Sequence, residues 1–207
     1  MALHVAEHPL IDDVMARLRD RDTQCEEFRR LARRVSVLLV AEATRDLPLV
    51  EGSVETPLET ASARRLRRRV VAVPILRAGL GMLEAFVELI PQAHVGYFGL
   101  ERNEETAKAR AYYEKLPGDL EHAIVFLLDP MLATGGSAEM AVERLHSLGA
   151  MNVRLLSIVA APEGVARLEK LRPEVAVYAA ALDRELDERK YILPGLGDFG
   201  DRLYGTL

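Results

Sequence analysis

The chain has 207 residues, of which 49% are apolar, and this length and composition suit one well-packed domain. Its net charge of -5 and isoelectric point near 5.6 argue against broad binding to nucleic acid or to an anionic membrane. Cys25 is the only cysteine, which excludes an internal disulfide and favours a reducing compartment, so we expect a cytoplasmic location. No apolar run approaches the roughly 20 residues of a membrane span, so we expect no membrane segment.

The first third of the chain predicts helices followed by an arm. Leu10 to Asp46 carries apolar residues on two helical stripes, which predicts two helices ahead of the sheet. Leu49 to Arg65 alternates apolar and polar residues around a proline and predicts a hairpin or edge-strand arm. Such an arm is suited to reach toward another subunit.

The rest of the chain repeats a unit of apolar run, small-residue turn and amphipathic helix, which predicts an α/β fold whose parallel sheet is flanked by helices. The predicted strands are Val70 to Leu76, Val95 to Leu100, Ile124 to Asp129, Val153 to Ala160 and Val175 to Ala181. The predicted helices are Leu80 to Leu89, Ser137 to Leu148 and Gly164 to Leu171.

Two segments outside this repeat predict irregular structure. Glu101 to Leu120 is polar and poorly periodic, which predicts a long loop with room for a short hairpin. Tyr191 to Arg202 mixes glycine and proline with apolar residues, which predicts a shaped loop and not a helix. The domain organisation expected is one domain over 1–207, with N-terminal helices and arm in 1–69, a core sheet in 70–182 and a tail in 183–207.

The strongest chemical signal is the junction after the strand Ile124 to Leu128. There a carboxylate and a glycine-rich turn lead into a helix N-terminus, which attracts anions through free N–H groups and the helix dipole. This predicts a phosphate cradle with a carboxylate for a sugar diol, although an ordinary strand-to-helix turn is the simpler alternative. No lysine follows the glycines, which argues against a P-loop. The cradle comprises Asp129, Pro130, Met131, Leu132, Ala133, Thr134, Gly135, Gly136 and Ser137.

Other candidate residues follow neighbouring strands, and ligands of parallel sheets bind at the carboxyl ends of the strands. Arg77 opens a glycine turn suited to a diphosphate, unless it only pairs with a carboxylate. Arg102 lies on the polar segment, where a solvated role is the alternative, and Glu104 and Glu105 beside it suit a wet loop face. Two anion sites, a carboxylate and a backbone-lined tail meet the needs of a phosphoribosyl diphosphate donor and a nucleobase acceptor.

These residues resemble those of the type I phosphoribosyltransferases and, among them, of the uracil phosphoribosyltransferase family. The resemblance extends over nearly the whole chain. It rests on VPILRAGLGM from Val73, RNEET from Arg102, DPMLATGGSA from Asp129, AAPEG from Ala160 and YILPGLGDFGDRLYGT from Tyr191.

The resemblance implies a type I phosphoribosyltransferase-like fold with a C-terminal base-binding loop region, and conversion of uracil and 5-phospho-α-D-ribose 1-diphosphate (PRPP) into UMP and diphosphate in pyrimidine salvage. The cradle would hold the ribose and 5-phosphate, with Arg77 and Arg102 on the diphosphate. Mg²⁺ would act through substrate oxygens, with Asp198 near the reacting centre, in reach of PRPP and the metal. The resemblance further implies a homodimer or homotetramer and a GTP effector. Uracil would be bound by Ile192, Gly197, Asp198 and Phe199.

Four residues depart from the family pattern, which usually has Asn, Gly and Ala at the first three positions and often Tyr at the fourth. They are Asp187, Lys190, Phe199 and Glu101. Two alternatives stay open: a phosphoribosyltransferase for another base, favoured if Phe199 reshapes the pocket, and a regulator that senses UMP or PRPP and binds RNA. The acidic balance argues against the regulator, and we interpret the arginine run at 64–69 as a solvated turn.

Overall fold

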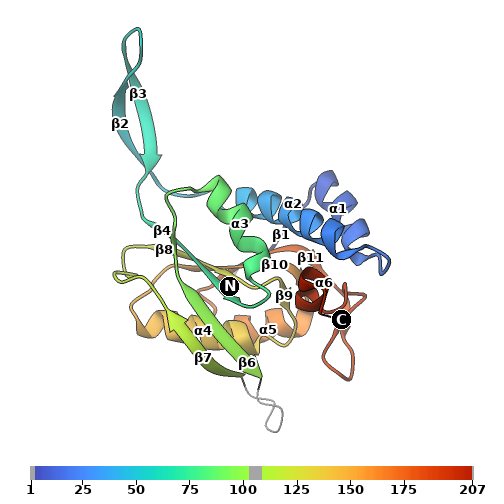
Figure 1. Ribbon diagram of the computed structural model, residues 1–207. Helices are drawn as coiled ribbons and strands as arrows, with labels where there is room; N and C mark the ends of the chain where they lie inside the picture. The colour runs from blue at the N-terminus through green and yellow to red at the C-terminus, as the bar shows by residue number, and fades with distance from the viewer. Residues whose placement is uncertain (1–2, 103–108, 207) are drawn as a thin grey trace.

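The computed structural model describes residues 3–102 and 109–206, and its centre is a mostly parallel sheet (Figure 1). The strands along the main path run in the order β1-β11-β10-β8-β4-β6-β7, with β5 beside β4 and β9 beside β10. Their bounds are β1 Leu3–Val5, β4 Val70–Leu76, β5 His94–Val95, β6 Tyr97–Arg102, β7 Ala109–Lys115, β8 Ile124–Leu128, β9 Met131–Leu132, β10 Val153–Ala160 and β11 Ala176–Leu182.

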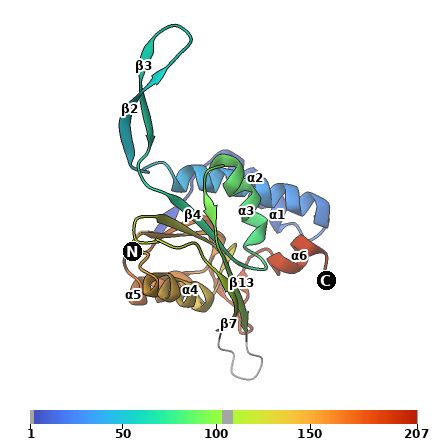
Figure 2. The ribbon, with the colours of Figure 1, turned by 60° about the vertical axis from the view of Figure 1, so that its left-hand side comes forward.

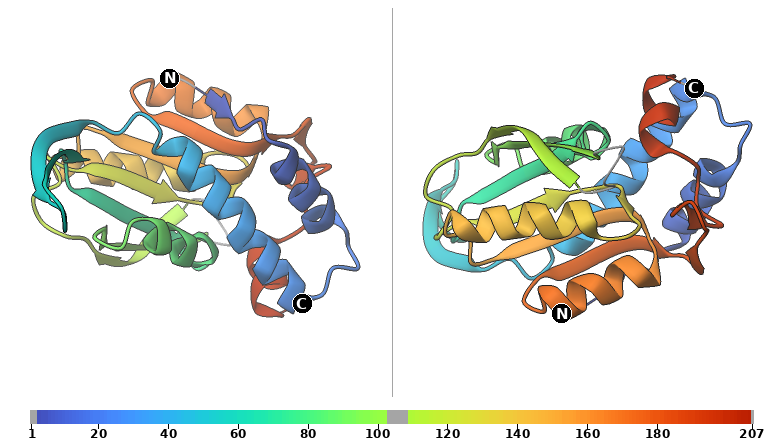
Figure 3. Two further views of the ribbon diagram at one scale, coloured as in Figure 1. Left: turned by 90° about the horizontal axis from the view of Figure 1, so that it is seen from above. Right: turned by 90° about the horizontal axis from the view of Figure 1, so that it is seen from below.

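Helices cover both faces of this sheet, so the strands β8 and β10 are buried along their whole length. One face packs against α1 (Pro9–Arg19), α2 (Cys25–Ala43) and α3 (Leu80–Leu89). The other packs against α4 (Gly136–Ser147) and α5 (Pro162–Leu171). The two views of Figure 3 show these layers from opposite sides. The predicted α/β class, with a parallel core sheet flanked by helices, is therefore confirmed.

The predicted arm is a hairpin of β2 (Leu49–Glu55) and β3 (Thr60–Leu66), which stands away from the body of the protein (Figures 1 and 2). Along β2 and at the turn it exposes large apolar side chains; Leu58 is 95% exposed. Exposed apolar groups on a projecting hairpin mark a surface that association could cover.

Several predicted elements coincide with observed ones, namely β4, α3 and β10, whose bounds match. The predicted helix pair at the N-terminus is also confirmed, but β1 precedes it and pairs parallel with β11, which the sequence reading missed. A three-residue strand has too few positions to show a period, and here its partner lies far along the chain.

The predicted strand Val95 to Leu100 is two strands, β5 and β6, separated at Gly96. The segment predicted as a long loop contains β7, which pairs antiparallel with β6 and so forms the hairpin that was allowed for. Residues 103–108 lie outside the described residues.

The tail carries a correction. β12 (Glu185–Leu186) and β13 (Ile192–Leu193) form a small ladder, and α6 (Phe199–Tyr204) follows. The prediction that Tyr191 to Arg202 is a loop and not a helix is therefore wrong for residues 199–202, which belong to α6. The helix forms because Asp198 caps its first turn and Gly205, with a φ of 70°, ends it. Within the two described stretches, no helix is long and apolar enough to cross a membrane.

Candidate active site

The predicted site residues gather at the carboxyl edge of the sheet, around the end of β10. The last residues of β10 pair with β9 on one side and with β11 on the other. The N–H of Ala161 donates to the carbonyl of Leu132, 2.9 Å away, and the N–H of Asp183 donates to the carbonyl of Ala160, 2.8 Å away. The phosphate cradle and the start of the tail thus flank the same strand end.

The cradle has the backbone geometry of an anion site. Gly135 is the N-cap of α4, with a φ of 77°, and no side chain caps the first turn. The left-handed conformation explains why glycine stands there, and the uncapped turn leaves helix N–H groups for a ligand. Pro130 and Leu132 are buried, so only their main chain can reach a ligand, whereas Thr134 and Ser137 are half-buried.

Asp129 lies directly after β8, at the mouth of the cradle. Its side chain is half-buried, and desolvation raises the pKa of the carboxyl to about 7. The N–H of Met131 donates to the Asp129 Oδ1 atom at 3.4 Å and lowers the pKa, an effect that is smaller than that of desolvation. A carboxyl in this state is poorly solvated, and hydroxyl donors from a ribose would stabilise its ionised form.

The helix α5 packs closely against the cradle, a contact that was not predicted from the sequence although the AAPEG motif was noted there. A Cβ on Gly164 would lie 2.4 Å from the carbonyl oxygen of Ala133, so α5 approaches the turn more closely than any other residue would permit. Beside it, Arg167 bonds Glu139 of α4 through Nε at 2.7 Å. These contacts hold the N-termini of both helices against the turn.

Arg77 lies on the adjacent turn, between β4 and α3. Its side chain is exposed, and the guanidinium carbon is 5.8 Å from the centre of the Tyr204 ring. The Tyr204 hydroxyl donates to the carbonyl of Arg77 at 3.1 Å. A Cβ on Gly79 would meet the carbonyl of Leu128 at 2.3 Å, so this turn sits tightly against the end of β8 that leads to Asp129.

The tail places the predicted base-binding residues in different environments. Asp198 is exposed, and its Oδ1 accepts from the N–H of Asp201 at 2.9 Å. Gly197 is exposed with a φ of 81°, and Ile192 is buried. The Phe199 ring is 1% exposed and packs edge-on against Phe28, so it offers a ligand only its main chain.

Two of the other unusual residues lie in one turn of the tail. Lys190 has a φ of 70°, a conformation that favours glycine. Its N–H donates to the carbonyl of Asp187 at 2.9 Å, and the Asp187 Oδ1 accepts from the N–H of Tyr191 at 2.8 Å. The turn is therefore closed by Asp187, with strain at Lys190. The side chains of Glu101 and Arg102 lie outside the described residues, as do Glu104 and Glu105.

The tail is anchored by charged groups that the sequence reading did not single out. Arg19 at the end of α1 binds both carboxylate oxygens of Asp183, at 2.8 and 2.6 Å, and also the carbonyl of Gly195 at 2.7 Å. Arg202 donates to the carbonyls of Leu18 and Leu196 at 2.6 and 2.7 Å. Neither arginine shows a sequence signal, since the partners of each come from distant parts of the chain.

The carboxyl edge thus combines an uncapped helix N-terminus after a glycine turn, a half-buried carboxyl, an exposed guanidinium and an irregular tail. This arrangement on this fold defines a phosphoribosyltransferase of the type I class. The purine phosphoribosyltransferase of Pyrococcus horikoshii (TM-score 0.50, 15% identity, 76% of this chain and 89% of that chain) shares the fold.

The particular family follows from closer relatives. The chain belongs to the uracil phosphoribosyltransferase family, whose model matches residues 5–206. It is 49% identical to the uracil phosphoribosyltransferase of Shouchella clausii over 99% of this chain and 98% of that protein. It is similar to the AQ2163 protein from Aquifex aeolicus, with a TM-score of 0.94 and 40% identity over 99% and 98% of the two chains. The enzyme is accordingly a pentosyltransferase.

Proposed function

We propose that this enzyme joins uracil and PRPP into UMP and diphosphate. The observation that carries the proposal is the junction at Asp129, where a half-buried carboxyl adjoins an uncapped helix N-terminus and lies beside the turn of Arg77. The test is a UMP-formation assay with PRPP and each of several bases. Turnover with uracil alone is expected; turnover with another base but not with uracil would refute it.

The site residues divide the work between the two substrates. The N–H groups at the start of α4 hold the 5-phosphate, and Asp129 accepts from the ribose hydroxyls. Arg77 holds the diphosphate, whose charge grows as the glycosidic bond breaks. The main chain of Gly197 to Phe199 reads the edge of uracil, and Asp198 lies near its reacting nitrogen. Positioning and charge neutralisation carry this displacement, and it needs no protein nucleophile.

Magnesium fits this site through the substrate. No group of three or more His, Cys, Asp or Glu that could hold a metal occurs in the described ranges, so a metal held wholly by protein side chains is not part of the proposal. Asp198 is an exposed carboxylate, of the oxygen type that Mg²⁺ prefers, and one of its oxygens already caps α6. When bound, Mg²⁺ supplies charge neutralisation for the diphosphate leaving group.

The position of Phe199 favours uracil over another base as the acceptor substrate. Because its ring is buried against Phe28 and away from solvent, the bulky residue does not fill the space of a base. The regulator alternative has less support, since the family and the site both describe an enzyme. Filter binding to a pyrimidine leader RNA tests it, and no binding is expected.

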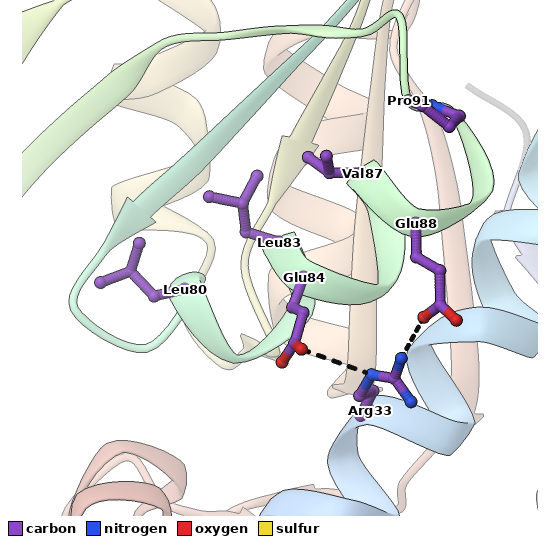
Figure 4. Close-up of a pocket in the computed structure, with 7 residues that line it drawn as sticks. All are labelled: Arg33, Leu80, Leu83, Glu84, Val87, Glu88 and Pro91. Atoms are coloured by element: carbon purple, nitrogen blue, oxygen red, sulfur yellow. Dashed lines mark hydrogen bonds and ion pairs between the residues drawn. The ribbon is translucent and has the colours of Figure 1, made fainter.

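We propose that the enzyme is a homo-oligomer in which the β2–β3 arm packs on a second copy. The arm exposes an apolar surface, and a groove on the outer face of α3 is lined by Leu80, Leu83, Val87 and Pro91, with Arg33 paired to Glu84 and Glu88 along its edge (Figure 4). Both are apolar surfaces that association would cover. Leu58→Glu is expected to lower the mass measured by light scattering, whereas Met151→Glu, at a 76% exposed position elsewhere, leaves it unchanged.

A cytoplasmic location and a GTP effector stay predictions. The location rests on the single cysteine, and the effector rests on the resemblance alone. Activity measured with and without GTP tests the second, with a change in the PRPP concentration for half-maximal rate as the expected result.

A further inference from the structure

Ser157, in the middle of β10, is a buried polar residue next to the carboxyl edge of the sheet. Its side chain is 0% exposed, and Oγ has no hydrogen-bond partner in the described part of the chain. A buried hydroxyl without a partner costs free energy, and native proteins keep few of them. On the β11 side its register partner is Ala179, which offers no polar atom from its side chain.

On the other side of β10 the register brings Ser157 opposite Asp129. Leu156 pairs with Leu128, and Val159 pairs with Met131 at the same offset, so the intervening Ser157 falls opposite Asp129. The N–H of Asp129 donates to the carbonyl of Leu156 at 3.1 Å, which continues the ladder to this point. Neighbouring strands are about 4.8 Å apart, so the two residues are adjacent.

The two side chains also share a face of the sheet. Leu127 and Leu155, two positions earlier on each strand, both belong to the apolar cluster beneath α4 and α5. The alternation of side chains along a strand, continued one residue beyond the end of β8, places Asp129 on the same side as Ser157. Among the described residues, the carboxyl accepts the N–H of Met131 at 3.4 Å and no other hydrogen bond. It therefore has acceptor capacity to spare beside a hydroxyl that lacks an acceptor.

We infer that Ser157 is a positioning residue for PRPP binding. When ribose hydroxyls hold Asp129 as a carboxylate, the Ser157 hydroxyl rotates about its Cα–Cβ bond and donates to the inner carboxylate oxygen. This bond compensates the burial of the charge and fixes the outer oxygen toward the ribose diol. The inference rests on the proposed function, because it needs a donor whose ribose meets Asp129.

The test compares PRPP binding, by calorimetry with magnesium present, in Ser157→Ala and in a matched control. Ser36 is also 0% exposed, but its Oγ donates to the carbonyl of Ala32 at 2.7 Å within α2. Ser157→Ala is expected to raise the Kd for PRPP roughly tenfold, or about 1.4 kcal/mol. Ser36→Ala should leave the Kd unchanged.

Three further measurements distinguish a positioning role of Ser157 from a structural one. Ser157→Ala should unfold at the same temperature as the free wild type or higher, since it removes an unpartnered hydroxyl. Ser157→Thr, which keeps the hydroxyl on a residue that strands tolerate, should restore the Kd. In steady state, the KM for uracil should stay unchanged while the KM for PRPP rises.

A double-mutant cycle connects the effect to its partner. In the Asp129→Asn background, Ser157→Ala should cause no further loss of PRPP affinity, because the carboxylate it serves is gone. Wild-type affinity in Ser157→Ala, or an equal loss in Ser36→Ala, would overturn this role alone. Absence of PRPP binding by the wild type would instead refute the proposed function, and this role with it.

Discussion

We expect the poorly solvated carboxyl of Asp129 to lower the free energy of unfolding, and we expect Asp129→Asn to restore part of that loss. Desolvation raises the pKa of Asp129 from its ordinary value of 3.8 to about 7. That difference corresponds to roughly 4 kcal/mol between the protonated and ionised forms in the folded state. The amide of asparagine keeps part of the burial cost, so a net gain of about 2 kcal/mol in the free energy of unfolding is expected at pH 8.

The stability difference between Asp129→Asn and the wild type should also depend on pH, and this dependence is a stricter test. Between about pH 4 and pH 7 the folded protein holds a proton that the unfolded chain has released, so the stability of the wild type falls as the pH rises. Above pH 7 both states are ionised and the penalty is constant. The advantage of Asp129→Asn over the wild type should therefore grow from pH 5 to pH 8, by about 2 to 3 kcal/mol.

Urea unfolding of both proteins at the two pH values measures this difference. PRPP binding should be weaker but still measurable in the same variant, since an amide replaces only one of the two carboxylate oxygens as an acceptor. An advantage that is equal at pH 5 and pH 8 would show that the Asp129 carboxyl is not the destabilising group. Loss of stability at pH 8 would refute the assigned burial cost altogether.

Three further substitutions test the supports of the site. Gly164→Ala should destabilise the fold by about 2 kcal/mol in urea and weaken PRPP binding, because its Cβ would lie 2.4 Å from a cradle carbonyl; Gly52→Ala, with nothing within 4 Å, is the control and should do neither. Lys190→Gly should stabilise by about 1 kcal/mol by relieving a φ of 70°, whereas Lys190→Ala should bring no gain. Asp183→Asn should lower the free energy of unfolding by about 3 kcal/mol, because it breaks the bond of both carboxylate oxygens to Arg19 at the base of the tail. It should also raise the KM for uracil more than the KM for PRPP, and equal changes in both KM values would contradict that assignment.

Most of the sheet and the cradle could be predicted because their signals are local. A mostly apolar run identifies β10, and the sequence after β8 shows the carboxylate, the glycines and the helix start in order. The helix α6 was missed although its cap and its terminal glycine, Asp198 and Gly205, are both visible in the sequence. Six residues containing a glycine show no helical period, so only the end signals were available.

The rest of the site depends on pairings that no local pattern contains. Arg19 and Asp183 are 164 residues apart, and their contact exists only because α1 ends beside the exit of β11. The opposition of Ser157 and Asp129 depends on the register of two strands that are separated by α4 along the chain. A sequence shows that Ser157 is polar in an apolar run, but its neighbour becomes known only from the folded sheet.

The short helix α6 connects the two halves of the site. At its N-terminus, Asp198, which we propose lies beside uracil, accepts from the N–H of Asp201. At its C-terminal end, Tyr204 donates to the carbonyl of Arg77, which we propose binds the diphosphate. Its inner face is held by Phe199 against Phe28 of α2. A shift of α6 would therefore displace groups for both substrates at once. A bulky residue at position 199 is therefore compatible with the site, because its ring stabilises α6, the helix that positions Asp198 and contacts the turn of Arg77.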